Sequence, residues 1–176
     1  MLLGRISLIA VALLTFGFME TSAAIALDEI VGRARSVTGD TIKIKSIDDG
    51  KTRRVRLFGV NAPDPRQHCE TKHGESVNCG FMALDALDVM IRKKQITCVD
   101  LDKDAEGVIT GTCYVGDQIL NSSIVRAGWA LAYVKESSDF LGLEERARAA
   151  GKGIWPFRFE KPWIWRAEQE KAKNNN

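Results

Sequence analysis

Three short segments near the start of the chain alternate apolar with polar residues, which is the pattern of half-buried β-strands. They span residues 30–36, 41–47 and 53–60. Turn-forming residues separate them, at Thr38 to Asp40 and at Asp48 to Gly50. The pattern predicts an antiparallel meander with one buried face. The opposite face is basic, because the polar positions of the second and third segments include Lys43, Lys45, Arg54 and Arg56.

A helical period replaces the period of two after a polar loop over residues 61–79. Apolar residues between Ala83 and Ile91 recur at helical spacing, so we expect a helix over residues 80–94. Further elements are then expected in this order: strands over 95–101 and 108–115 about a turn at Ala105 and Glu106, and helices over 121–128 and 141–151.

The C-terminal segment is rich in tryptophan, with Trp155, Trp163 and Trp165 after Gly153. We expect it to pack irregularly over the domain, and its polar end, from about Glu168, to fray. The chain then divides into an N-terminal leader, one domain and a C-terminal extension with a polar tail, over residues 1–26, 27–160 and 161–176.

Four cysteines form two candidate disulfides. Cys98 and Cys113 are symmetric about the predicted turn, so a tight hairpin places them opposite each other near disulfide distance. Cys69 and Cys79 would close the long loop before the first helix. The alternative for that loop is a zinc site, built from its two cysteines with His73 and His68.

The first 26 residues have the three-part pattern of a secretory signal peptide. Arg5 precedes an apolar run, and small residues follow it, with cleavage expected after Ala24 or Ala26. The run is too short for a membrane-spanning helix, which needs about 20 residues. An uncleaved signal anchor is the alternative. We therefore expect an exported protein, periplasmic or extracellular, with no stable membrane association after cleavage and with oxidised cysteines.

Composition narrows the class of protein without naming its function. A chain of 176 residues with 45% hydrophobic content is enough for about one domain with a proper core, and it is not disordered. The net charge of +2 is too small to identify a nucleic-acid binder. The sequence also lacks a phosphate-binding glycine loop, a zincin helix and a nucleophilic serine elbow.

Two motifs carry a resemblance to a known family. Gly39, Asp40 and Thr41 lie at the first predicted turn, and the string Arg-Leu-Phe-Gly-Val-Asn-Ala-Pro-Asp spans residues 56–64. Together with later fragments up to Trp155, they resemble the staphylococcal nuclease family over residues 29–157. The resemblance implies an α+β, mainly β fold: an OB-type five-stranded barrel with about three helices. It also implies calcium-dependent hydrolysis of phosphodiester bonds in DNA and RNA.

Functional residues can be carried over from the family position by position. Arg56 matches an arginine on the phosphate, and Asp40 matches a carboxylate on the metal. Asn61 stands where the family has a second metal aspartate, and Ala62 would offer its backbone carbonyl to the metal. Asp64 stands where the family has a catalytic glutamate, and its side chain is one methylene shorter.

The predicted hairpin departs from the family, which commonly has Tyr-Gly-Arg there with the arginine on the phosphate. Val108 stands at the arginine position, and Glu106 brings a negative charge. Loss of one such donor can lower the rate by about two to three orders of magnitude. Lys103 or Arg54 could compensate. Tyr133 matches a later tyrosine beside the substrate.

Two hypotheses of different classes follow. The first is an exported, calcium-dependent nuclease of reduced or altered activity, a monomer that acts on single-stranded nucleic acid. Calcium binding is expected to be weak, because Asp40 and Asp64 are the expected carboxylate ligands. The second is a catalytically degenerate OB-fold binding or assembly module of the cell envelope, linked to exopolysaccharide production.

Overall fold

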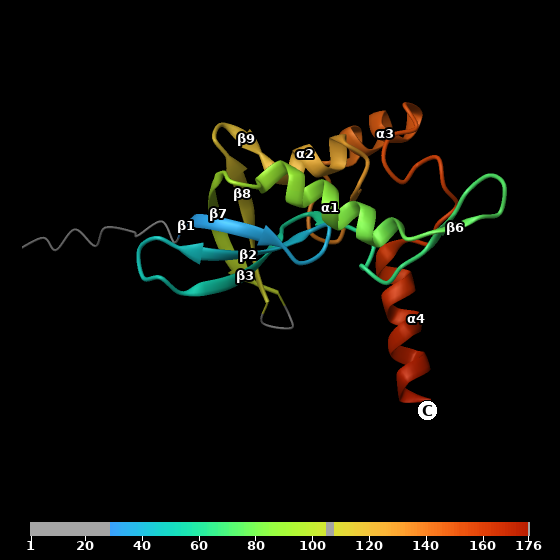
Figure 1. Ribbon diagram of the computed structural model, residues 1–176, viewed down its shortest axis with the longest axis horizontal. Coiled ribbons are helices and arrows are strands. Elements are labelled where there is room, and N and C mark those ends of the chain that lie inside the picture. Colours follow the sequence, from blue (N-terminus) through green and yellow to red (C-terminus); the bar gives the residue numbers. More distant parts are fainter. Residues whose placement is uncertain (1–28, 105–107, 176) are drawn as a thin grey trace, which may run out of the picture.

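The computed structural model describes residues 29–104 and 108–175, so the predicted signal peptide and Glu106 lie outside the described residues. A curved sheet forms the body of the molecule (Figure 1). Its strands are β1 (Ile30–Ser36), β2 (Thr41–Ser46), β3 (Thr52–Leu57), β7 (Gln95–Lys103) and β8 (Ile109–Val115), and the two-residue β9 (Gln118–Ile119) extends it beyond β8. The strand order is β3-β2-β1-β7-β8, and β3 pairs with β8 in parallel. This pairing closes the sheet into the predicted five-stranded barrel.

Alternation along β2 and β3 supplies much of the barrel core. Ile42, Ile44, Val55 and Leu57 are fully buried, whereas the residues between them face outward. Burial of such side chains contributes about 1.5–3 kcal/mol each. The expected third strand is shorter than predicted, because the chain turns at Gly59, whose φ is 73°. A Cβ there would also lie 2.6 Å from the ring of Phe140.

Helices cover part of the barrel in the described chain (Figure 1). They are α1 (Cys79–Ile91), α2 (Leu120–Arg126), α3 (Leu141–Ala149) and α4 (Pro162–Asn174). The Asn78 side chain caps α1 by accepting a hydrogen bond from the Phe81 N–H at 2.8 Å. Helix α1 ends earlier than predicted, before Lys93, whose φ is 61°.

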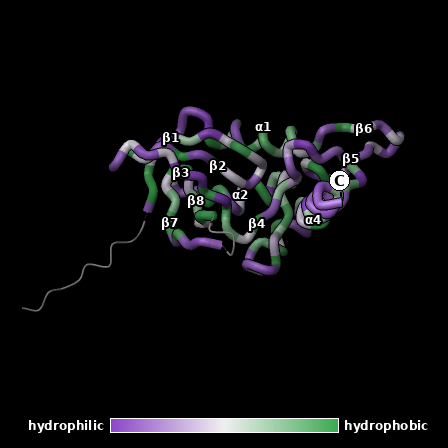
Figure 2. The backbone as a smooth tube through the Cα atoms, turned by 90° about the horizontal axis from the view of Figure 1, so that it is seen from below, coloured by the Kyte–Doolittle hydropathy of each residue, from purple (hydrophilic) through white to green (hydrophobic). Residues whose placement is uncertain are grey.

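The C-terminal segment differs from the expectation of irregular packing and a frayed end. Pro162 begins a regular helix, α4, which continues through Glu168 to Asn174. Trp163 packs onto a small apolar cluster around Leu131 and Ile154. The rest of α4 runs away from the body of the molecule (Figure 1), and its sequence is mostly hydrophilic (Figure 2).

Both predicted disulfides are present. Cys98 pairs directly with Cys113 across β7 and β8, with their Cα atoms 4.0 Å apart. Cys69 and Cys79 are joined across the loop before α1, with their Cα atoms 5.6 Å apart. That loop contains a short hairpin, β5 (Cys69–Glu70) and β6 (Ser76–Val77). The zinc alternative loses two of its ligands, because both of its cysteines are in a disulfide.

Candidate functional site

Arg56 lies near the end of β3, beside Thr41 of β2 and Thr110 of β8. Its side chain is 17% exposed and is held by two acids. Nη1 and Nη2 donate to the two carboxylate oxygens of Glu136 at 3.0 and 2.6 Å, and Nη2 also donates to Asp104 at 3.2 Å. Burial lowers the pKa of Arg56, but the bonds and charge of Glu136 outweigh it, so the pKa is raised.

Glu136 was not among the residues that the sequence singled out. Besides the Arg56 guanidinium, its Oε2 accepts the backbone N–H of Gly59 at 2.8 Å. The glutamate therefore places a planar anion with two oxygens in a pocket of fixed donors. Glu136 follows Tyr133, a predicted site residue, by three positions, and this closeness in sequence was the one available indication of its role. The spacing does not predict that its side chain points towards Arg56.

Asp40 is 4% exposed, and its carboxylate oxygens are already hydrogen-bonded. Oδ1 accepts the hydroxyls of Thr38 and Thr41 at 2.6 and 2.9 Å, and Oδ2 accepts the N–H of Ala62 at 2.8 Å. These bonds tie the first turn to the chain after β4 (Val60–Asn61), which pairs with β10 (Leu131–Ala132). The charge of Asp40 also acts on Arg56, so the structure does bring these two predicted residues together.

Arg166 of α4 contacts the other two predicted metal ligands. Its Nη2 donates to Oδ1 of Asn61, and its Nη1 donates to the backbone carbonyl of Ala62 at 3.2 Å. Asn61 is 6% exposed, so the contact lies at the edge of the buried core. No sequence pattern pointed to this arginine, because the expected C-terminal segment had no defined place on the domain.

Asp64 is held by its near neighbour Arg66. The guanidinium donates to both carboxylate oxygens at 2.8 and 3.1 Å, and the Arg66 N–H adds a third bond at 3.0 Å. Burial, the largest influence, raises the pKa of Asp64, but the bonds from Arg66 and the charges of Arg66 and Arg166 lower it below its usual value. Asp64 is therefore ionised at neutral pH, as a general base must be.

Helix α4 also reaches Tyr133 and the partner of Asp64. The rings of Tyr133 and Trp163 lie with centroids 5.5 Å apart, and the Arg66 guanidinium lies 5.7 Å from the centre of the Trp165 ring. With Arg166, three residues of the first two turns of α4 contact the predicted site. The tyrosine expected beside a substrate is thus partly covered by the chain itself.

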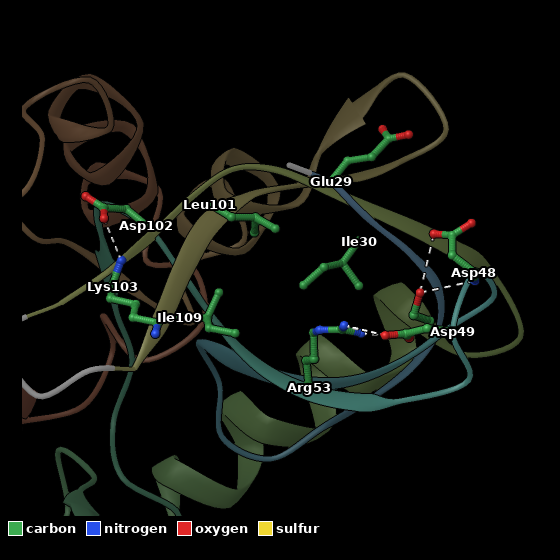
Figure 3. Close-up of a pocket in the computed structure, with 10 residues that line it drawn as sticks. Glu29, Ile30, Asp48, Asp49, Arg53, Leu101, Asp102, Lys103 and Ile109 are labelled. Atoms are coloured by element: carbon green, nitrogen blue, oxygen red, sulfur yellow. Dashed lines mark hydrogen bonds and ion pairs between the residues drawn. The ribbon is translucent and has the colours of Figure 1, made fainter. Parts of the chain in front are cut away.

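Lys103 and Arg54, the two residues that could compensate for Val108, lie in different surroundings. Val108 uses its backbone N–H to bond the Asp104 carboxylate at 2.7 Å. Lys103 lines a cavity of about 500 Å³ with Arg53 and Asp49 (Figure 3). That cavity lies at the Ser46 end of β2, whereas Asp40 precedes the other end. Arg54 is exposed on the outer face of β3.

Basic side chains do form rows across the outer face of β1, β2 and β3. Arg35 lies opposite Lys43, which lies opposite Arg54, and Arg33 lies opposite Lys45. The predicted basic face is therefore wider than the second and third strands alone. Such a surface favours polyanions.

The oxygen ligands of the predicted calcium site are not arranged to bind a calcium ion. Calcium takes six to eight oxygen ligands, with several carboxylates in tight sites. Here the Asp40 oxygens accept three bonds from the chain, and Asn61 and Ala62 accept bonds from Arg166. Among residues 29–104 and 108–175, no group of three or more His, Cys, Asp or Glu is placed to hold a metal. The same residues include no helix long and apolar enough to cross a membrane.

Comparison with known proteins gives consistent matches. The model of the family described as staphylococcal nuclease homologue matches residues 54–156. The succinoglycan biosynthesis protein ExoI of Rhizobium meliloti is 30% identical over 159 residues, which cover 87% of this chain and 78% of that protein. An uncharacterized endonuclease of Escherichia coli is 31% identical over 143 residues, covering 78% and 86% of the two chains. A probable staphylococcal-like nuclease of rice, CAN2, is 26% identical over 125 residues, covering 69% of this chain and 31% of that protein.

Proposed function

Since the chain belongs to the staphylococcal nuclease family, we propose that it binds single-stranded nucleic acid and hydrolyses its phosphodiester bonds at a reduced rate. The observation that carries this proposal is the Arg56 fork, which holds the two oxygens of a carboxylate at 2.6 and 3.0 Å. A phosphodiester offers two non-bridging oxygens to the same donors.

In the proposed mechanism the substrate phosphate takes the place of the Glu136 carboxylate. Arg56 and the Gly59 N–H then bind the phosphate and stabilise the charge that develops on its oxygens. Asp64, three residues after Asn61, gives up its bonds to Arg66 and accepts a proton from the attacking water. The water oxygen bonds to phosphorus while the P–O bond to the leaving sugar oxygen breaks, and that oxygen takes a proton from solvent. No other step is assigned to the described residues.

Three features support a reduced rate. Val108 supplies no side-chain donor at the position of the family's second arginine. Glu136 competes with the substrate for Arg56, and Asp64 must give up its bonds to Arg66 before it can act. Each of these costs lowers the fraction of molecules that are ready to bind and cleave.

The basic face supports a polyanion as the substrate. Its rows of lysine and arginine lie on the same three strands that place Asp40 and Arg56. A single strand of nucleic acid carries the repeated charge that such a face binds. We further propose that the protein acts as a monomer.

We propose that calcium binding is weak, because the oxygens expected to bind the ion already accept bonds from the chain. We also propose that the protein is exported to the periplasm or beyond the cell and is not held at the membrane after cleavage. The N-terminal pattern and the two disulfides support this location.

The test is to incubate the mature protein with denatured DNA and with RNA, each with calcium and with chelator. We expect slow cleavage that falls at least about 100-fold in Arg56→Ala. The matched control is Arg126→Ala, since Arg126 is an exposed arginine at the end of α2. Cleavage that Arg56→Ala leaves unchanged would show a contaminating nuclease and contradict the proposal.

A second candidate function is a binding module linked to exopolysaccharide production. Two observations favour it: the name of the Rhizobium relative, and the engagement of Arg56 and Asp40 by the chain's own groups. OB-type barrels bind oligosaccharides as well as oligonucleotides. Saturable binding of an acidic polysaccharide, with no cleavage of DNA or RNA under any metal condition, would favour this function over the first.

A further inference from the structure

The first turns of α4 bring a cation to the place where the family resemblance puts a metal. Arg166 donates one bond to Oδ1 of Asn61 and one to the carbonyl of Ala62, at 3.2 Å for the carbonyl. Both oxygens are among the ligands expected for calcium. Its positive charge also lowers the pKa of Asp64, so the guanidinium acts on the loop after β4 as well as on Asn61 and Ala62.

The amino acid at position 61 agrees with this arrangement. The family has two aspartates around a divalent cation, whereas here Asp40 keeps its charge and Asn61 has none. One carboxylate balances one guanidinium, just as two balance a divalent ion. The loss of a ligand charge at Asn61 and the arrival of Arg166 therefore compensate each other. An amide oxygen is also a good acceptor for a guanidinium N–H.

Neighbouring contacts fix the arginine in place. Trp163 packs against Tyr133 and Trp165 lies against Arg66, so two residues that shortly precede Arg166 in the helix are anchored to the site loops. Pro162 is buried at the start of α4. An arginine whose helix is held in this way loses little further entropy when it binds.

From this geometry we propose that Arg166 is the resident cation of the site and takes the place of calcium. Calcium binding would require the guanidinium to leave Asn61 and Ala62, and the ion would then meet a ligand set with one charge fewer. The consequence for the substrate rests on the proposed function: phosphate binding and cleavage do not depend on added calcium.

The experiment measures calcium binding to the folded full-length mature protein, without substrate, by isothermal titration calorimetry after treatment with chelator. Four variants are compared with the wild type: Arg166→Ala, Asn61→Asp, the double variant with both changes, and Lys171→Ala. Lys171 is exposed on the same helix, so its variant removes an equal charge away from the site. If Arg166→Ala does not fold, Arg166→Met, which keeps an apolar stem, replaces it in both variants.

We expect no saturable binding of millimolar calcium by the wild type or by Lys171→Ala. The double variant should bind calcium at least about tenfold more tightly than the wild type, because it frees the site and restores the second carboxylate. Asn61→Asp alone should stay close to the wild type, since the guanidinium would hold the new carboxylate. A merely structural arginine would change the melting temperature without producing this gain.

The proposal is overturned if the wild type binds calcium as tightly as the double variant does. It is equally overturned if Asn61→Asp alone reaches the affinity of the double variant, or if the double variant gains no affinity. Cleavage assays add a separate arm, in which wild-type cleavage should persist in chelator. If no cleavage occurs at all, the proposed function fails while the calcium titrations still decide the role of Arg166.

Discussion

At the scale of single residues, the site is an arrangement of charged and polar side chains that bond to one another. Arg56 is held by Glu136 and Asp104, Asp64 by Arg66, and Asn61 by Arg166. Breaking a buried pair leaves one charge without its partner, which costs more than removing both charges. A substrate must therefore compete with the chain's own groups, and this competition can be measured.

Glu136→Gln tests the competition at Arg56. The amide still accepts the Gly59 N–H but carries no charge, so a phosphate meets less resistance at the guanidinium. We expect the Kd for a short single-stranded oligonucleotide to fall about tenfold, which corresponds to about 1.4 kcal/mol. Fluorescence anisotropy measures the Kd. Glu145→Gln, at an exposed position on α3, is the control, and weaker binding by Glu136→Gln alone would argue against the competition.

At the scale of elements, the strands were predictable and the last helix was not. Period-two alternation located β2 and β3 within a few residues, and the symmetry of Cys98 and Cys113 predicted the register of β7 and β8 around these cysteines. An irregularity between Val99 and Asp102, which the symmetry did not predict, shifts the register by one residue towards the turn. In α4 the apolar residues Trp163, Ile164 and Trp165 are consecutive, so they do not show the spacing of one helix face. Its position on the site depends on tertiary packing, which no local pattern contains.

The two disulfides give a prediction about elements. The double variant Cys98→Ala and Cys113→Ala releases a cross-strand link with a sequence separation of 15, and should lower the free energy of unfolding by about 3 kcal/mol. Urea denaturation measures the loss. The matching variant at Cys69 and Cys79, with a separation of 10, should lose slightly less. A loss below about 1 kcal/mol at the barrel disulfide would contradict a stabilising role for it.

At the scale of the whole molecule, the family resemblance predicted the barrel and the roles of Asp40 and Arg56, and the alternation located the strand ends beside which both residues lie. It did not predict the contacts of Glu136 and Arg166, which join segments far apart along the chain. Glu136 lies inside the span that the family model matches and Arg166 lies beyond it, and a family resemblance carries residue positions but not the side-chain contacts that tertiary packing makes.

The basic face makes a prediction about the molecule as a polyanion binder. Lys43 lies in the middle of the row with Arg35 and Arg54. Lys43→Ala should weaken oligonucleotide binding equally for different sequences, and should lower the slope of log K against log salt by about 1. Anisotropy titrations at several salt concentrations measure the slope. Lys171→Ala should leave it unchanged, and an unchanged slope in Lys43→Ala would place the bound strand elsewhere.

The closing pair of the barrel also sets the order in which the molecule can be completed. Val55 of β3 pairs with Ile109 of β8, so β3 can complete its pairing only after the much later strand β8 has been synthesised. Distant pairings of this kind form slowly, because a long loop must close before any contact compensates for its lost entropy. The hydrogen bond from Arg166 to Asn61 forms later still, because Arg166 lies near the end of the chain. A ribosome that has not yet released the C-terminal helix therefore carries a chain whose site is incomplete.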